Sequence, residues 1–404
     1  MTAYSFKGLE PTLEIMRTPR SADIEITSRC NLRCRYCYYF DNPDVEYRDL
    51  PTDEWLRFFD ELGRCTVMDI TLQGGEPFIR EDLPQLIGGI VHNRMRFSIL
   101  SNGTLIDDAI AAFLADTNRC NSVQVSVDGS GSEAHDACRG KGSFEDAIRG
   151  IRTLQRHKVP VAVRVTIHRH NVHDLEGIAR LLLEEIGLAE FSTNAAGYLG
   201  TCRQNAKEVM LTIRDRQEAM ETLLLLTERY KGRIWAQAGP LAEAEMWRLM
   251  EEARQKGDPS LAEGGHLTAC GCHNKNINVR ADGVITPCNM LAHMELGRIN
   301  QTSLAEIWHN HPDLNQLRQR HTIALNEFEF CAGCPYIPYC TGNCPALAYS
   351  ITGKVDHPSP DACFRRFLKN GGKLPKLPIE ERPRGLNDRG AGLPPLEDRG
   401  AETN

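Results

Sequence analysis

Apolar residues follow two alternating patterns along the first half of the chain. Short runs rich in β-branched and aliphatic residues predict strands, and the segments between them carry apolar residues at the spacing of amphipathic helices. The predicted strands are residues 23–28, 67–72, 96–101, 122–128, 160–167 and 190–194, and the predicted helices are residues 53–62, 81–92, 107–116, 144–157 and 172–186. This alternation predicts an α/β fold with a parallel sheet, organised as a partial (β/α)6 barrel.

The pattern changes in the second half of the chain. Residues 206–256 are rich in Glu, Ala, Leu and Arg, which favours helix, and a cysteine-dense region follows. The last stretch is rich in Pro, Gly and charged residues and has little to bury, so we expect it to be disordered. The predicted organisation is an N-terminal arm (1–20), a barrel (21–205), a helical bridge (206–265), a cysteine-rich domain (266–368) and a tail (369–404).

Composition excludes several classes of function. The 404 residues are 41% hydrophobic and 25% charged, with a net charge of −7, which gives no reason to expect binding to nucleic acid or to an anionic membrane surface. The sequence has neither a signal peptide nor a run of ~20 apolar residues, so we expect a cytoplasmic protein. Fifteen cysteines in a reducing compartment indicate ligands to metal or iron–sulfur clusters, not disulfides.

Three cysteines, Cys30, Cys34 and Cys37, are spaced C-x3-C-x2-C directly after the first predicted strand. An iron–sulfur cube has four irons, and a purely structural one takes four cysteines, so three thiolates leave one iron open to a substrate or cofactor. A zinc site is the alternative, because grouped thiolates also suit tetrahedral zinc. Structural zinc needs a fourth ligand, and no nearby residue supplies one convincingly.

The cysteine stretch resembles the signature of the radical S-adenosylmethionine (SAM) enzymes. In that family the residue before the last cysteine, here Tyr36, lies beside the adenine of SAM. One βα unit later, Gln73, Gly74, Gly75 and Glu76 begin the stretch QGGEP, which matches the family's motif for the amino group of SAM. Paired glycines let the backbone approach a ligand closely, and a carboxylate accepts hydrogen bonds from an ammonium.

Two later strand ends extend the predicted SAM site. Ser101 and Asn102 end one predicted strand, and Ser126 lies near the end of the next. By the same resemblance, Ser126 and Arg139 hold the ribose and carboxylate of SAM, and a guanidinium can pair with a carboxylate in bidentate fashion. The loop before Arg139 is one residue longer than in the sulfatase-maturing relatives. Capping of a strand end is the alternative role for Ser126 and Asn102.

The resemblance implies a reaction that side chains cannot perform alone. A [4Fe–4S] cluster, reduced by a donor such as flavodoxin or ferredoxin, cleaves SAM and yields a 5′-deoxyadenosyl radical. That radical removes hydrogen from an unactivated C–H bond, and the cofactor carries this chemistry.

Eight cysteines remain in the C-terminal region, and their spacing resembles the SPASM domain of peptide-modifying radical SAM enzymes. By this resemblance two auxiliary [4Fe–4S] clusters make a total of three. The single-residue spacing of the first two cysteines departs from the sulfatase-maturing version, which leaves an open coordination site as an alternative, and two zinc sites are a further alternative. The implied ligands are Cys270, Cys272, Cys288 and Cys344 for one cluster and Cys331, Cys334, Cys340 and Cys363 for the other.

The family resemblance implies a class of substrate. Most members that resemble this chain modify ribosomally made peptides, so we predict a precursor peptide as substrate, with a crosslink or an altered side chain as the product. Sulfatase maturation and the synthesis of peptide-derived redox cofactors are alternatives, and a zinc-binding scaffold is the non-enzymatic one. Asn289 follows Cys288 where sulfatase-maturing enzymes have an aspartate base, and an amide cannot take a proton at neutral pH. Because Cys30 lies near the start, leader recognition is expected to need a separate protein or the SPASM surface.

Overall fold

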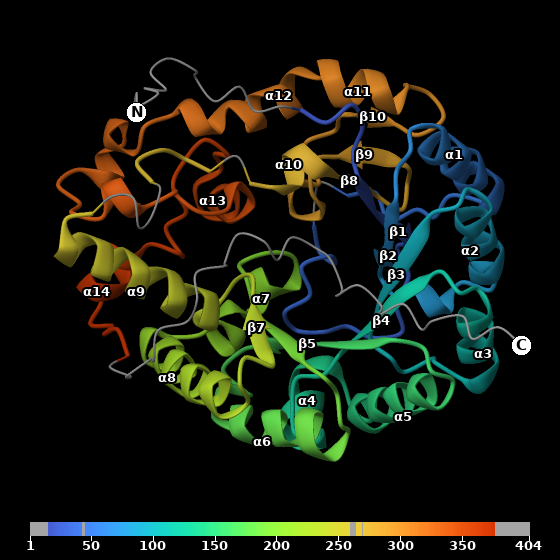
Figure 1. Cartoon of the computed structure of the whole chain (residues 1–404), viewed down its shortest axis with the longest axis horizontal. Helices are drawn as coiled ribbons and strands as arrows, with labels where there is room; N and C mark the ends of the chain where they lie inside the picture. The colour runs from blue at the N-terminus through green and yellow to red at the C-terminus, as the bar shows by residue number, and fades with distance from the viewer. Residues whose placement is uncertain (1–14, 43–44, 259–263, 269, 376–404) are drawn as a thin grey trace, which may run out of the picture.

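The computed structural model describes residues 15–42, 45–258, 264–268 and 270–375 (Figure 1). These residues form a ten-stranded sheet with the order β10-β9-β8-β1-β2-β3-β4-β5-β6-β7. All neighbours from β8 to β7 are parallel, and β9 and β10 are antiparallel. The strands are β1 Ser21–Thr27, β2 Asp69–Gly74, β3 Arg96–Ser101, β4 Cys120–Ser126, β5 Val161–Ile167, β6 Phe191–Ala195, β7 Ile234–Ala236, β8 Asn276–Val279, β9 Val284–Thr286 and β10 Gly297–Arg298.

Helices cover the outer side of the curved sheet (Figure 1). The helices of the barrel are α1 Thr52–Arg64, α2 Leu83–His92, α3 Asp108–Asp116, α4 Ser132–Arg139, α5 Ser143–Arg156, α6 Leu175–Arg180, α7 Thr201–Val209, α8 Ile213–Arg229 and α9 Pro240–Lys256. The cysteine-rich region adds α10 Cys272–Lys275, α11 Leu304–Asn310, α12 Pro312–Gln319, α13 Pro345–Thr352 and α14 Phe364–Lys369. No helix in the described part of the chain is long and apolar enough to cross a membrane.

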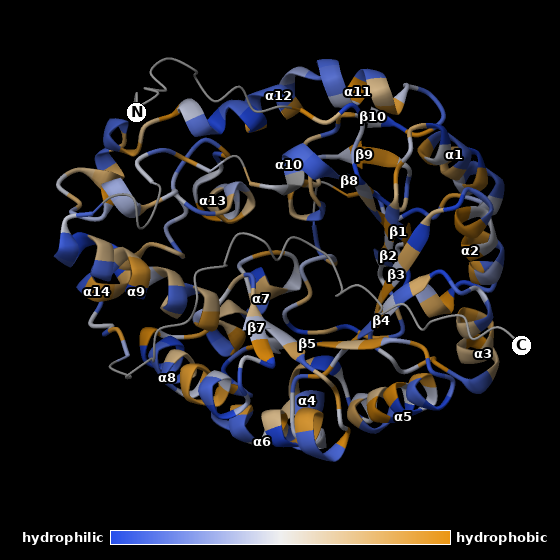
Figure 2. Cartoon of the chain, viewed as in Figure 1, coloured by the Kyte–Doolittle hydropathy of each residue, from blue (hydrophilic) through white to orange (hydrophobic). Residues whose placement is uncertain are grey.

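The main core lies between the strands and the outer helices. Helix α1 contributes Trp55, Phe58 and Phe59, whose three- and four-residue spacing places them on one face, and they share a core with Ile24 and Leu72 of the sheet. Figure 2 shows the resulting mixture of hydrophobic and hydrophilic residues along each helix. The sequence predicted these βα units, and the consecutive parallel pairing of β1 to β6 confirms the partial barrel.

The inner face of the sheet is polar, because side chains alternate between the two faces of a strand. In β5, Val163 and Val165 are buried in the core, which places Arg164 on the inner face. In β1, Ile24 packs in the same core, and Glu25 faces inward and is only 2% exposed. The inner face of the barrel therefore carries polar and charged side chains.

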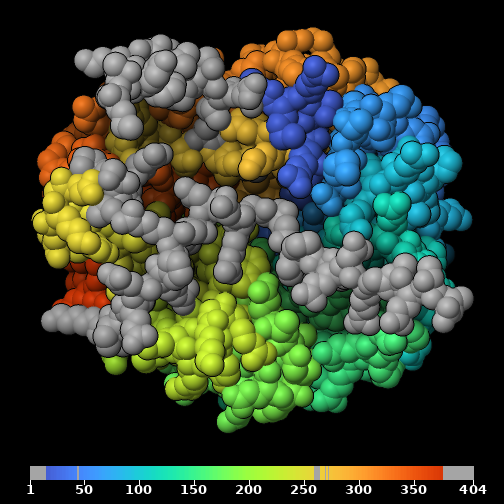
Figure 3. All heavy atoms as spheres, viewed as in Figure 1, coloured from blue at the N-terminus to red at the C-terminus, as the bar shows by residue number. Residues whose placement is uncertain are grey.

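The cysteine-rich region extends the barrel sheet instead of forming a separate layer. Strand β8 pairs in parallel with β1, from Ser21 opposite Asn276 to Ile24 opposite Val279. In the space-filling view the orange C-terminal elements lie directly against the blue N-terminal ones (Figure 3). The predicted bridge, residues 206–265, also contains more than helix, because β7 adds to the edge of the sheet beside β6.

Candidate functional site

The predicted SAM-cluster cysteines lie together in the loop that follows β1. The Cys37 amide donates to the Cys34 carbonyl over 3.2 Å, and the Leu32 amide donates to Cys30 Sγ over 3.4 Å. All three thiols are partly buried. Burial raises the pKa of Cys37 to about 11, and the neighbouring Cys34 and Cys30 thiols add to the rise. The loop thus directs three thiols toward one another.

Two glycines allow the next strand to pass closely beneath this loop. A Cβ on Gly74 would lie 2.3 Å from the Thr27 carbonyl oxygen, and a Cβ on Gly75 would lie 2.0 Å from that of Arg29. Such contacts are impossible for any other residue without movement of the backbone. The Gly75 amide donates to the Thr27 carbonyl over 2.8 Å. The backbone at these two glycines therefore packs directly against the start of the cysteine loop. A larger residue at either position would push the two segments apart.

Glu76 is 1% exposed and is held by three donors from the chain. The Ser101 hydroxyl donates to Oε1 over 2.8 Å, the Asn102 amide donates to Oε2 over 2.7 Å, and the Phe78 amide donates to Oε1 over 3.2 Å. Burial raises the pKa of Glu76 to about 7, although these hydrogen bonds oppose the rise. Its carboxylate therefore ties the QGGEP turn to the end of β3.

The Asn102 side chain connects that same strand end to the cysteine loop. Its Nδ2 donates to Asn31 Oδ1 over 2.9 Å and lies 3.8 Å from Cys30 Sγ. Its Oδ1 accepts from the Thr104 hydroxyl over 2.7 Å. Gly75 and Asn102, which directly follow β2 and β3, thus both lie against the first cysteine.

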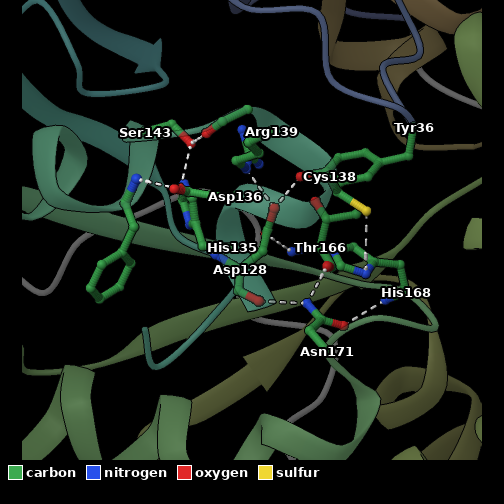
Figure 4. A network of polar contacts seen from close by, with 12 residues as sticks. Tyr36, Asp128, His135, Asp136, Cys138, Arg139, Ser143, Thr166, His168 and Asn171 are labelled. Carbon is green, nitrogen blue, oxygen red and sulfur yellow. Dashed lines mark hydrogen bonds and ion pairs between the residues drawn. The ribbon is translucent and has the colours of Figure 1, made fainter. Parts of the chain in front are cut away.

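A buried carboxylate, Asp128, organises the other side of the loop (Figure 4). Arg139 Nε donates to Oδ2 over 2.5 Å, the Tyr36 hydroxyl donates to the same oxygen, and the Thr166 amide donates to Oδ1 over 2.7 Å. Arg139 also hydrogen-bonds Cys34. The guanidinium that the family resemblance assigns to the SAM carboxylate is therefore committed to Asp128 and to the Cys34 thiol. Ser126 is half-buried at the end of β4.

Two histidines complete this network, and neither was singled out from the sequence. His135 Nδ1 accepts from the Asp128 amide over 3.1 Å, and His168 lies 5.2 Å from Tyr36, ring centroid to ring centroid. Burial lowers the pKa of each imidazole to about 4, so both rings are neutral at pH 7. Asn171 donates to the Asp128 carbonyl over 2.9 Å. Of the side chains in this network, the sequence had pointed to Tyr36 and Arg139.

A chain of weaker polar contacts joins the barrel to the cysteine-rich region. Tyr38, next to the third cysteine, donates to Gln73 Oε1 over 3.3 Å and accepts from Asn289 Nδ2 over 3.3 Å. Asn289 also accepts from the Cys288 thiol over 3.3 Å. The residue after Cys288 thus lies one side chain away from the SAM-cluster loop.

The cysteines of the C-terminal region form two separate groups. Burial raises the pKa of Cys331 to about 12, and the thiols of Cys340, Cys334 and Cys363 add to the rise, which puts these four together. Burial raises the pKa of Cys344 to about 11, with contributions from Cys270 and Cys288. These groups coincide with the two predicted ligand sets, apart from Cys272, which begins α10 and whose side chain lies outside the described part of the chain.

Buried cations lie beside one of the two thiol groups. Arg320 is fully buried, forms an ion pair with Asp356 over 3.7 Å, and also interacts electrostatically with Cys344 and Cys270. The nearby Arg318 is 3% exposed, and its buried Nη2 has no hydrogen-bond partner in the described structure. Buried cations suit a cluster that carries negative charge.

The fold and the thiols define a barrel enzyme of the iron–sulfur class, and comparison with known proteins agrees. Residues 24–182 match the Radical SAM superfamily, and residues 270–335 match SPASM, an iron–sulfur cluster-binding domain. The chain belongs to the radical SAM/SPASM family. Its cofactors are accordingly SAM and [4Fe–4S] clusters.

Individual relatives have different substrates. The chain is 28% identical to an Fe-coproporphyrin III synthase of Methanosarcina barkeri, over 84% of this chain and 86% of that protein. It is 27% identical to a PqqA peptide cyclase of Granulibacter bethesdensis, over 87% and 88%. The solved structure of Streptococcus suis SuiB bound to its precursor peptide SuiA has the same fold, with a TM-score of 0.65 and 14% identity over 87% and 77% of the two chains.

Proposed function

We propose that this radical SAM/SPASM enzyme oxidises a ribosomally made precursor peptide in the cytoplasm and installs a crosslink or an altered side chain. The main support is the contact between Tyr38 and Asn289. It brings the residue after Cys288 next to the SAM-cluster loop. A substrate that has lost a hydrogen atom must also give up an electron to complete a two-electron oxidation, and an auxiliary cluster at Cys288 would be close enough to receive it.

In this proposal three groups of cysteines hold three [4Fe–4S] clusters. Cys30, Cys34 and Cys37 hold the SAM-binding cluster, which when bound supplies the electron that cleaves SAM. Gly74 and Gly75 allow the strand to pack closely against the loop, and Tyr36 lies beside the adenine. The site around SAM is lined by polar side chains, those of Gln73, Ser101, Asn102 and Ser126. The cysteines of the C-terminal region form the two auxiliary groups described above. Flavodoxin or ferredoxin supplies electrons.

A peptide substrate is supported by relatives of similar identity. The PqqA peptide cyclase acts on a peptide by its name. A mycofactocin maturase, MftC of Mycolicibacterium smegmatis, is 26% identical over 92% of this chain. Leader recognition would then fall to a separate protein or to the SPASM surface.

A tetrapyrrole is the second candidate substrate. The Fe-coproporphyrin III synthase and an AdoMet-dependent heme synthase of the same organism, 25% identical over 87% of this chain, favour it. A sulfatase-type substrate has less support, because Asn289 donates its Nδ2 to Tyr38 and cannot accept a proton as an aspartate would.

One experiment separates these possibilities. Anaerobically reconstituted enzyme is incubated with SAM, dithionite and either a precursor peptide encoded beside the gene or an iron coproporphyrin. We expect 5′-deoxyadenosine together with a peptide whose mass falls by a multiple of two hydrogens. Conversion of the porphyrin alone would replace the peptide proposal with the tetrapyrrole one. A colourless protein with stoichiometric zinc would contradict the enzyme assignment.

A further inference from the structure

Two buried arginines, Arg318 and Arg320, hold the chain segment that carries Cys270. Arg318 lies in the last turn of α12 and Arg320 directly after it, and α12 packs beside α10 (Figure 1). Arg320 Nη1 donates to the Thr268 carbonyl, and Arg318 Nε donates to the His273 carbonyl over 3.0 Å. The two guanidinium groups therefore bind main-chain carbonyls on either side of Cys270.

Arg320 also lies close to the thiols of this group. It interacts electrostatically with Cys344 and Cys270. The main chain agrees with this placement, because the Cys270 amide donates to the hydroxyl of Thr268, the residue that Arg320 holds, over 3.2 Å. The Thr268 amide donates to the Thr341 carbonyl over 2.7 Å, three residues before Cys344. Arg320 is thus a cation beside two of the predicted ligands of one auxiliary cluster.

The protein balances the charge of Arg320 only in part. The side chain is fully buried, and its ion-pair partner among the described residues, Asp356, lies 3.7 Å from Nε. At this distance neither Nε nor Asp356 Oδ1 has a hydrogen-bond partner within the described structure. Burial lowers the pKa of Arg320 although Asp356, Cys344 and Cys270 oppose the effect. A further negative charge beside the guanidinium would therefore stabilise its charged form.

Arg318 differs from Arg320 in one respect. It is 3% exposed, donates to the Trp308 carbonyl over 2.6 Å, and its guanidinium lies 4.4 Å from the centroid of the Trp308 ring. Burial lowers its pKa to about 10, and no thiol or carboxylate of the described residues contributes to the shift. The two arginines share burial and main-chain contacts, but of the two Arg320 is the one that interacts with thiols.

A fixed cation beside an iron–sulfur cluster favours the reduced state of the cluster. Reduction adds one electron, so the cluster becomes more negative and its attraction to the cation grows. The potential of a cluster depends on its charge, on hydrogen bonds to its sulfurs and on its exposure to solvent. Salt screens a buried charge much less than an exposed one, so a fully buried guanidinium should have a strong effect.

We propose that Arg320 raises the reduction potential of the auxiliary cluster held by Cys270, Cys288 and Cys344, and so suits this cluster to accept an electron. The inference rests on the ligand set and the electron transfer of the proposed function. There, a substrate that has lost a hydrogen atom to the 5′-deoxyadenosyl radical passes one electron to the oxidised cluster and one proton to water. A higher potential of the cluster makes this transfer more favourable.

The test is a potentiometric titration of anaerobically reconstituted holoenzyme without SAM or substrate, followed by electron paramagnetic resonance. The reduction step that disappears when Cys288→Ala is combined with Cys344→Ala identifies the cluster. In Arg320→Gln, the ratio of reduced to oxidised cluster at the wild-type midpoint of that step should fall about tenfold, a downward shift of about 59 mV for one electron. Arg320→Lys, which keeps the charge, should stay near the wild type, and the steps of the other clusters should not move.

Two further variants separate charge from packing. Arg318→Gln removes an equally buried guanidinium from the same helix end and should shift the midpoint much less. Asp356→Asn removes the opposing charge and should raise the midpoint, so the inference can be tested even if R320Q fails to retain its iron. An unchanged midpoint in R320Q with full iron, equal shifts in R318Q and R320Q, equal shifts in R320K and R320Q, or no rise in D356N would overturn the inference.

Failure of the inference can be told apart from failure of the proposed function. If no reduction step disappears in the variant with Cys288→Ala and Cys344→Ala, the ligand set of the proposed function is wrong, and the role of Arg320 falls with it. If the step disappears there but is unmoved in R320Q, the ligand set stands and only the role of Arg320 is refuted.

Discussion

Arg139 donates to Asp128 over 2.5 Å, and the two side chains are 8% and 0% exposed. Desolvation would oppose ionisation of this pair, but the carboxylate also accepts from Tyr36 and from the Thr166 amide, so its charge is compensated. The pair connects α4, β5 and the cysteine loop. It therefore stabilises the geometry on which the thiols depend.

Replacement of Asp128 by Asn should leave Arg139 as an unpaired buried cation. We expect a loss of about 3–5 kcal/mol in the free energy of unfolding, measured anaerobically by denaturant titration. The control is Asp108→Asn, whose partners Arg156 and His157 lie at the surface, and it should change stability little. Equal effects of the two substitutions would contradict the structural role of Asp128.

The buried histidines predict a loss of stability in acid. His135 and His168 have folded-state pKa values of about 4 against an ordinary 6.5, because burial disfavours their charged forms. Between these values the unfolded chain binds more protons, so stability is full above pH 6.5 and is lost as the pH falls toward 4. Each histidine contributes up to about 3 kcal/mol to this loss. His135→Gln should show a shallower dependence of unfolding free energy on pH than the wild type, and an unchanged slope would refute this account.

The glycine beneath the cysteine loop gives a test of its geometry. Gly75→Ala would bring a Cβ within 2.0 Å of the Arg29 carbonyl oxygen, so the loop must move. We expect iron content to fall from about twelve to about eight per chain, with no cleavage of SAM. Gly88→Ala is the matched control, because no atom lies within 4 Å of its added Cβ in α2. It should retain all iron and be equally stable or slightly more stable.

The auxiliary cysteines should be separable from cleavage of SAM. Cys331→Ala combined with Cys334→Ala removes two thiols of one group, and we expect about eight irons to remain. Reductive cleavage of SAM should continue, because the loop after β1 is untouched, but substrate product should be lost. Iron analysis and quantification of 5′-deoxyadenosine measure the two effects. Loss of cleavage with all other iron retained would show that the two regions are not independent.

Most of the barrel could be predicted from the sequence, because β1 to β6 alternate with amphipathic helices over long segments. The short strands β7 and β8 could not, since three or four residues carry too little periodicity, and their pairing depends on contacts far along the chain. The spacing of the cysteines along the chain was enough to predict which thiols lie together. The commitment of Arg139 to Asp128 and the position of Arg320 beside the auxiliary thiols could not be predicted, because electrostatic pairing inside a fold depends on which buried side chains happen to meet.

The parallel pairing of β1 with β8 has a consequence for how such enzymes can diversify. The strand that leads into the SAM-cluster loop and the strand that leads toward Cys288 are held in register by backbone hydrogen bonds. In the proposed function, the spacing between the cluster that cleaves SAM and the auxiliary cluster at Cys288 would thus be fixed by the main chain. Inward-facing side chains could then change to suit a new substrate while the proposed route of the electron stays constant.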